Sequence, residues 1–443
     1  MTLHAKTALL PDGWARDVRL TLTGGQITSV STGTPPEPGD HRADALIPGL
    51  SNLHSHAFQR GFSGLTEQRG PGRDSFWTWR EMMYRFALSL TPEAMQAIAA
   101  LAYIEMLEAG FTRVGEFHYL HHAPDGRTYA NPAEMSARIF AAAGDSGISL
   151  THLPVFYAHG GFGPEPAGGG QRRFLHDPDG FARLVQSCDT MTRPQDRVGM
   201  APHSLRAATM GQITELAKAF PDRPIHIHIA EQVQEVNDCL AFSGQRPVQS
   251  LLAQAPVGPD WCLIHATHLT RAEAQGIAAS GAVVGLCPIT EANLGDGIFP
   301  AREFLAAGGR FGLGTDSNVQ ITAAGEASML EYTQRLSLRA RNVCADTGST
   351  GARLFHVAAL GGAQALGAPA PLITSGAPAD LVALHDPMAL DMADDRLLDR
   401  WIFGRNVRVT DVWAAGNHLV RDGRHIARDH ILRQAAIACR SVI

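Results

Sequence analysis

Two histidines, His54 and His56, stand two residues apart at the end of an apolar run and could bind one metal ion. In an extended strand, residues at positions i and i+2 point to the same side, so both imidazoles would converge. Imidazole nitrogens are common zinc ligands. A lone pair of this kind is more often two surface or hydrogen-bonded histidines, so a metal site requires further ligands elsewhere in the chain.

His228 can supply a third nitrogen and Asp316 a carboxylate oxygen. A catalytic zinc ion accepts both kinds of donor and keeps a position for water, whose pKa it lowers toward neutrality. His226 has the same facing as His228 in the strand alternation and competes for the role. We prefer His228, because it is nearer to the strand end and lies three residues before Glu231. His226 is then expected to be a deeper, hydrogen-bonded core residue.

Two further residues, Glu231 and His265, could act as acid or base beside these ligands, and Asp316 could do so as well as bind the metal. Glu231 would protonate a leaving nitrogen and stabilise a tetrahedral intermediate, although an acid at the start of a helix is favoured in any case. His265 would polarise the attacking water or stabilise its negative charge, unless it is a satisfied core histidine. Asp316 would accept the proton of the water as well as contact the metal, although a Thr-Asp-Ser run alone can be a helix cap. Together they predict metal-assisted hydrolysis.

The elements that must position these residues alternate between strands and helices. Eight strands are predicted, at 47–54, 111–116, 147–156, 197–201, 224–229, 261–265, 282–286 and 310–314. Helices are predicted between most of them, including one that begins with Thr91 as N-cap and Pro92 at its first position. This alternation favours an α/β fold, a (β/α)8 barrel of the TIM type, whose active sites lie at the carboxyl ends of the strands. A doubly wound sheet has similar local patterning and stays an alternative.

Both ends of the chain contain further strand-like segments, at 14–31 and again at 380–384, 407–414 and 418–421. They predict a small β-sandwich domain built from the two termini. The expected division is 1–46 for its N-terminal part, 47–370 for the metal-dependent barrel, and 371–443 for its C-terminal part.

The chain contains only two lysines, Lys6 and Lys218. Two-zinc members of such folds often bridge their metals with a carbamylated lysine from a barrel strand. Lys6 lies in the terminal β-segment and Lys218 in a predicted helix, so neither is placed to reach the site. A single-metal centre is therefore favoured, and a bridging carboxylate is the remaining route to a second ion.

Composition narrows the class of protein. The 443 residues carry a net charge of -6, so nucleic acid is not expected as a partner. No apolar run is long enough for a transmembrane helix, and the N-terminus has no secretory pattern. The six cysteines are scattered without a CxxC pair, which indicates reduced, buried thiols. We expect a cytoplasmic protein with no membrane association.

The motifs together resemble the deaminase branch of the amidohydrolase superfamily. The resemblance is carried by residues 48–50, 54–56, 228–231, 265 and 315–316, and residues 376–382 and 412–416 look like its β-sandwich half. Within that branch the chain resembles the formimidoylglutamate deiminases of histidine degradation, at residues 54–60, 76–80, 116–119, 201–206 and 226–232. That resemblance implies hydrolysis of N-formimino-L-glutamate to N-formyl-L-glutamate and ammonia, by a homodimer with one Zn²⁺ per subunit.

A glutamate-derived substrate would need partners for two carboxylates, and arginine binds a carboxylate through two parallel hydrogen bonds. Arg206 and Arg80 lie near candidate active-site loops and are the expected partners. Gln59, Tyr119 and His203 are the expected hydrogen-bonding helpers. An alternative interpretation of Arg80 is that it is a surface residue on an aromatic helix.

Two other functions stay open. A deaminase of the same branch could act on a nucleobase, nucleoside or triazine, but an aromatic substrate needs a stacking surface and fewer cationic anchors. A barrel that lost its chemistry could serve as a scaffold or binding module, but it would not need the full set of acids and bases. The sequence leaves open the metal, since iron, manganese or cobalt suit the same donors. It also leaves open the oligomeric state, which arginine binds which carboxylate, and whether residues 58–90 form a lid or an interface.

Overall fold

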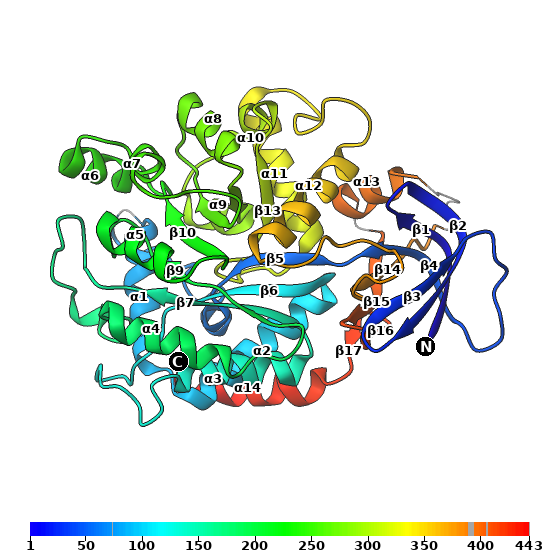
Figure 1. Cartoon of the computed structure of the whole chain (residues 1–443), viewed down its shortest axis with the longest axis horizontal. Helices are drawn as coiled ribbons and strands as arrows, with labels where there is room; N and C mark the ends of the chain where they lie inside the picture. The colour runs from blue at the N-terminus through cyan, green and yellow to red at the C-terminus, as the bar shows by residue number, and fades with distance from the viewer. Residues whose placement is uncertain (73, 389–393, 405, 443) are drawn as a thin grey trace.

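The structure is a computed structural model that describes residues 1–72, 74–388, 394–404 and 406–442. It consists of a barrel surrounded by helices and of a β-unit at one end, which stands on the right of Figure 1. The N-terminus begins in the β-unit, and the chain returns there after the barrel is complete. No helix among the described residues has the length and apolar character that crossing a bilayer requires.

Eight parallel strand positions form the barrel. They are β5 (Leu50–Ser55), β6 (Phe111–His118), β7 (Ser149–Phe156), β8 (Arg197–Val198) continued by β9 (Ala201–Pro202), β10 (Ile225–Ile229), β11 (Trp261–His265), β12 (Val283–Leu286) and β13 (Arg310–Leu313). Two parallel sheets, β5–β8 and β10–β13, are joined by bridges between Met200 and Ile225 and between Ser55 and Asp316. A doubly wound sheet would keep two free edges, so this closure confirms the barrel.

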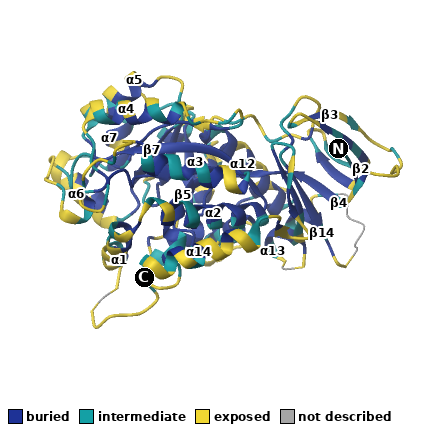
Figure 2. Cartoon of the chain, turned by 90° about the horizontal axis from the view of Figure 1, so that it is seen from below, coloured by how far each residue is buried: buried dark blue, intermediate teal, exposed yellow. Residues whose placement is uncertain are grey.

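Helices follow the strands and cover the outside of the barrel (Figure 2). They are η1 (Ala57–Phe62), α1 (Phe76–Ser89), α2 (Pro92–Glu108), α3 (Glu134–Ser146), η2 (Gly169–Gln171), α4 (Pro178–Asp189), α5 (Met210–Ala219), α6 (Val233–Ser243), α7 (Pro247–Gln254), α8 (Arg271–Ser280), α9 (Pro288–Leu294), α10 (Ala301–Ala306), α11 (Ala323–Leu338) and α12 (Thr350–Ala365). The helix expected at Thr91 begins there, because the Thr91 hydroxyl accepts a hydrogen bond from the Ala94 N–H.

The C-terminal end of α12 closes the floor of the barrel. Ala365 and Leu366 pack with Leu53 of β5 and with side chains of β11 and β12. The last carbonyls of the helix need donors, and the barrel strands supply them. His226 Nε2 lies 2.8 Å from the Ala365 carbonyl oxygen, and the Thr151 hydroxyl donates to the Leu366 carbonyl at 3.0 Å.

The β-unit is one eight-stranded sheet made from both ends of the chain. Its strands are β1 (Thr2–Leu10), β2 (Gly13–Thr23), β3 (Gln26–Ser31), β4 (His41–Pro48), β14 (Leu381–His385), β15 (Arg408–Ala414), β16 (Asn417–Arg421) and β17 (Arg424–His425), in the order β17-β16-β15-β14-β4-β1-β2-β3. β4 pairs with β1 on one side and β14 on the other, which joins the two termini. The unit has an apolar core of its own, which includes Leu20, Leu46 and Trp413.

The strand predicted at 47–54 is divided in two. Ile47 and Pro48 end β4, and the barrel strand begins only at Leu50. Gly49 makes the junction: its N–H donates to the Asp380 carbonyl, and a Cβ atom there would lie 2.3 Å from a Thr112 methyl group.

Two helices lie in the C-terminal segment for which only β-structure was expected. α13 (Arg396–Phe403) packs against α12, and α14 (Arg428–Val442) packs against α2 of the barrel. In α14 the buried residues Ile431, Ala435 and Ala438 recur at helical spacing, so one face is covered and the other is exposed (Figure 2).

Candidate metal and active site

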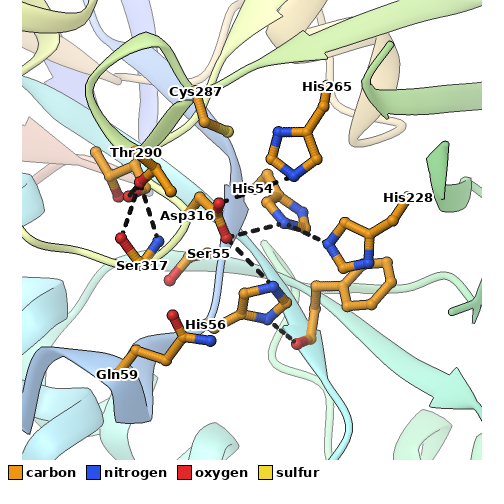
Figure 3. A network of polar contacts seen from close by, with 12 residues as sticks. His54, Ser55, His56, Gln59, His228, His265, Cys287, Thr290, Asp316 and Ser317 are labelled. Carbon is orange, nitrogen blue, oxygen red and sulfur yellow. Dashed lines mark hydrogen bonds and ion pairs between the residues drawn. The ribbon is translucent and has the colours of Figure 1, made fainter. Parts of the chain in front are cut away.

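His54 and His56 project from the end of β5 into the mouth of the barrel, where both are buried (Figure 3). His54 Nε2 lies 3.4 Å and His56 Nε2 lies 3.3 Å from Asp316 Oδ1. His56 Nδ1 lies 2.8 Å from the Phe117 carbonyl oxygen, which fixes the ring and leaves Nε2 to face the cluster.

His228, at the end of β10, completes the group. Its Nε2 lies 3.1 Å from His54 Nε2. Zinc–ligand bonds of roughly 2.0–2.2 Å place neighbouring donors of a tetrahedral site roughly 3.3 Å apart. The donor separations of 3.1–3.4 Å therefore fit a single cation held by His54, His56, His228 and Asp316. His226 points to the floor and takes no part.

The protonation states suit metal binding. Burial lowers the pKa of His54 to about 3 and also lowers the pKa values of His56 and His228, so all three imidazoles are neutral. Burial alone would raise the pKa of Asp316, but the hydrogen bond with His54 and the neighbouring histidines bring it below its ordinary value. Neutral nitrogens with one carboxylate are donors that zinc accepts.

Asp316 is held by hydrogen bonds between its loop and β5. The N–H groups of Thr315 and Asp316 donate to the His54 carbonyl at 3.1 and 2.9 Å. The Asn318 amide donates to the carbonyls of Asp316 and His56 at 3.0 and 3.2 Å. Asp316 itself has a left-handed backbone with φ of 46°, a conformation that costs about 1–3 kcal/mol outside glycine. The hydrogen bonds of the loop therefore hold Asp316 in a strained backbone conformation that directs its carboxylate toward His54 and His56.

His265 and Glu231 face the open side of the cluster. His265 Nε2 lies 3.9 Å from Glu231 Oε1 and 3.8 Å from Asp316 Oδ2. Burial would lower the pKa of His265, but Glu231, Glu291 and Asp316 outweigh it and raise the pKa to about 10. Burial raises the pKa of Glu231 to about 7, so this carboxyl group can both take up and release a proton near neutral pH.

Glu291 is a residue of the site that the sequence analysis missed. It lies in α9, is buried, and places Oε1 3.3 Å from His265 Nδ1 and 3.0 Å from the Cys287 N–H. It therefore fixes the ring of His265. The sequence could have indicated Glu291 by its position shortly after β12, because β12 was a predicted strand with no candidate polar residue at its end.

A pocket opens above the cluster. Its lining includes all the residues expected to bind metal, protons or substrate except the deeper His54, and α1 adds aromatic side chains to one wall. The lining residues are His56, Gln59, Phe76, Trp79, Arg80, Met83, Tyr84, Tyr119, Tyr157, Phe174, His203, Arg206, His228, Glu231, His265, Leu294 and Asp316. Residues of the segment 58–90 therefore line the site. Neither lysine is among the lining residues.

The two expected arginines reach the same part of the pocket. The Cζ atom of Arg80 lies 5.1 Å from the ring centroid of Trp77 and 5.2 Å from that of Tyr84. The Cζ atom of Arg206 lies 6.0 Å from the Trp77 centroid. Arg206 Nε is buried and has no hydrogen-bond partner among the described residues. Aromatic faces hold both guanidinium groups by cation–π contact, which leaves N–H edges for an anionic ligand.

The three expected helpers are also present. The Gln59 amide donates to the Tyr119 hydroxyl at 3.0 Å, and Gln59 Oε1 is buried without a partner in the described chain. His203 Nδ1 lies 3.1 Å from the Ser204 hydroxyl, and its ring packs against His228 at 4.9 Å between centroids.

Comparison with known proteins agrees with this geometry. The amidohydrolase family matches residues 45–419, and the chain therefore belongs to that family. Residues 1–44 match a second family, the N-terminal domain of formimidoylglutamate deiminase HutF. The formimidoylglutamate deiminase of Pseudomonas aeruginosa is 49% identical over 97% of both chains. These matches confirm the resemblance drawn from the sequence motifs.

Other relatives are more distant. The 8-oxoguanine deaminase of Pseudomonas aeruginosa is 28% identical over 91% of both chains. Among solved structures, an amidohydrolase from Brucella melitensis superposes with a TM-score of 0.98 at 52% identity, over 100% of this chain and 99% of the other. A zinc-bound adenosine deaminase from Xanthomonas campestris superposes with a TM-score of 0.82 at 23% identity, over 100% and 98%, and shares the fold.

Proposed function

We propose that the protein hydrolyses N-formimino-L-glutamate to N-formyl-L-glutamate and ammonia. The observation that carries this proposal is the pair of guanidinium groups, Arg80 and Arg206, in the pocket above the three histidines and Asp316. The deiminase of Pseudomonas aeruginosa, 49% identical, supports the same reaction.

The side chains divide the work of a hydrolysis. A divalent cation held by the histidines and Asp316 would lower the pKa of a water molecule, so that hydroxide is available near neutral pH. Asp316 accepts a proton from the nucleophile, and His265 stabilises negative charge beside it. Glu231 delivers a proton to the leaving nitrogen, for which a pKa of about 7 is suited. The formimino carbon loses ammonia and keeps the oxygen.

The glutamate part of the substrate carries two carboxylates, and two guanidinium groups match them in number and charge. The pocket also has an aromatic wall, which a nucleobase would need for stacking. Arg80 already lies over the ring of Tyr84 in this wall and over the neighbouring ring of Trp77, so the Tyr84 face is occupied. The arrangement therefore favours an anionic, linear substrate over a base or triazine.

The test is ammonia release by the zinc-loaded enzyme from N-formimino-L-glutamate, with adenosine and guanine assayed in parallel. We expect turnover of the first substrate only. Arg206→Gln should raise KM far more than it lowers kcat, because it removes a binding contact and leaves the reacting groups in place. Turnover of adenosine or guanine alone would replace this function by base deamination. No turnover of any of the three would favour a scaffold.

Four further parts of the proposal follow from the sequence and from the family resemblance. We propose one Zn²⁺ per barrel site, a homodimer, a cytoplasmic location and a place in histidine degradation. The boundaries 1–46, 47–370 and 371–443 are proposed as the units of the chain. Elemental analysis and analytical ultracentrifugation test the metal and the dimer directly.

A further inference from the structure

A second group of potential metal ligands lies in the β-unit. It consists of His41 at the start of β4, Asp411 in β15 and His418 in β16. One donor atom from each lies within 4.8 Å of the other two. β15 and β16 are neighbours in the sheet, whereas β14 stands between them and β4, so His41 comes from a strand that pairs with neither.

The two imidazoles converge on one oxygen. His41 Nε2 lies 3.2 Å and His418 Nε2 lies 2.8 Å from Asp411 Oδ1. The His41 separation falls within the 3.1–3.4 Å between donors at the barrel mouth, and the His418 separation is shorter and is that of a direct hydrogen bond. The side chains of Asp411 and His418 are 12% and 8% exposed, whereas His41 is 34% exposed. The group is therefore built into the unit and open to solvent on the side of His41.

Aromatic packing fixes both rings. The His418 ring stacks on Trp413 at 4.5 Å between centroids and 17° between planes. The His41 ring meets the edge of Trp413 at 5.2 Å. Trp413 is fully buried in the core of the β-unit, so the imidazoles keep their directions without a ligand. Preorganised donors lose little freedom when they bind an ion.

We propose that His41, Asp411 and His418 form a second binding site for a divalent transition-metal ion, of which zinc is the best match. Two imidazole nitrogens and one carboxylate oxygen suit zinc, and the exposed side leaves room for a water molecule as a fourth ligand. Hard cations such as calcium and magnesium prefer sites made of oxygen donors and are not expected.

The ion would cross-link the N-terminal and C-terminal segments of the chain. His41 belongs to the N-terminal segment, and Asp411 and His418 belong to the C-terminal strands. An ion that binds the folded state but not the unfolded one stabilises the fold in proportion to the logarithm of its concentration. The site lies outside the pocket of the barrel, so it contributes to the stability of the β-unit and not to turnover.

The experiment counts zinc in the whole protein. The chain is equilibrated by dialysis against Zn²⁺ alone, and bound zinc per chain is measured by mass spectrometry. We expect two ions in the unaltered protein and one in His418→Gln and in Asp411→Asn, with deiminase activity unchanged in both variants. Loss of the barrel ion by Asp316→Ala should leave one ion, which separates this site from the catalytic one.

The matched control is His385→Gln. It breaks another histidine–aspartate pair of the same sheet, between His385 and Asp44, and should keep both ions. Because a variant can fail to fold, a zinc-equilibrated crystal of the unaltered protein gives an independent readout. An anomalous peak enclosed by His41, Asp411 and His418 supports the site. A single bound ion in the unaltered protein, an unchanged count in both variants, or no peak at this position overturns it.

Discussion

The mouth and the floor of the barrel use the same kind of residue for different purposes. His228 and His226 stand two residues apart on β10, share a facing and are both buried. At the mouth, His228 Nε2 faces His54 Nε2 at 3.1 Å. At the floor, His226 Nε2 contacts the Ala365 carbonyl that ends α12. The first arrangement leaves donors to share a cation, whereas the second satisfies a helix end.

The difference shows which property marks a functional histidine. Burial lowers the pKa of both residues, to about 4 for His226 and well below its usual value for His228, so the pKa does not separate them. His152 is also buried with a lowered pKa; its Nε2 lies 3.0 Å from the Ser136 hydroxyl, and its ring packs against His118 and Phe140. A nitrogen that faces other donors, rather than one carbonyl or hydroxyl, distinguishes the candidate metal ligand from the core histidines.

The largest expected effect comes from replacing the two histidines of β10 one at a time. His228→Ala should remove turnover and the barrel zinc ion, because three donors cannot hold the cation as firmly. His226→Gln should keep both, since its amide can still donate to Ala365. Ammonia release and zinc content of the two variants give the comparison. Retained activity in His228→Ala, or its loss in folded His226→Gln, would reverse the assignment.

A smaller effect is expected at Glu231, two residues beyond the end of β10. Glu231→Gln removes the proton donor but leaves the metal ligands, so kcat should fall by about 10²–10⁴-fold, the usual contribution of a positioned acid or base. Zinc content should stay at the unaltered level. Steady-state kinetics with elemental analysis checks this. A drop in zinc that parallels the drop in kcat would instead make Glu231 a ligand.

Glu291 acts through His265 and should matter less than Glu231. Glu291→Gln weakens the contact that orients the imidazole, and losses of about 10–100-fold in activity are typical of such supporting groups. Glu291→Asp, which keeps the charge on a shorter side chain, should recover part of the loss. The measurement is kcat with circular dichroism as a folding control. Equal, complete inactivation of both variants would place Glu291 among the reacting groups.

His226, at the floor of the barrel, should affect how the free energy of unfolding depends on pH, and should not affect turnover. The folded state holds the pKa of His226 at about 4 against an ordinary 6.5, so the unfolded chain binds more protons between these values. Stability is complete above pH 6.5 and falls toward pH 4, by up to about 1.4 kcal/mol per pH unit for one group. Urea unfolding of the unaltered protein and His226→Gln should show a shallower slope in the variant; equal slopes would contradict the assignment.

The strand positions were predictable because buried apolar runs end in polar residues. β11 occupies the predicted residues 261–265, and the other barrel strands overlap their predictions closely. The junction at Gly49 was missed because the apolar residues before and after it were predicted to form one strand, although the Pro48-Gly49 pair between them is a turn signal. α14 was missed although Ile431, Ala435 and Ala438 recur at helical spacing, because two of these three residues are small alanines and mark the face that packs against α2 only weakly.

The residues of the site were predictable where they follow strands. The structure brings together His54, His56, His228 and Asp316, and the choice of His228 over His226 agrees with its geometry. Glu291 lies in a helix, and its role depends on the direction of His265. The cation–π contacts that hold the two arginines depend on how α1 folds over the mouth. These contacts join residues that are far apart in the sequence, so no local sequence pattern predicts them.

The β-unit has a consequence for the order in which the protein can be made. β4 ends at Pro48, and β14, which pairs with its free edge, begins at Leu381, more than three hundred residues later. During synthesis the first four strands therefore emerge with an open edge that can pair with another nascent chain. The ribosome must release almost the entire barrel before that edge is covered, so the β-unit is closed only after the barrel between its two parts has been made.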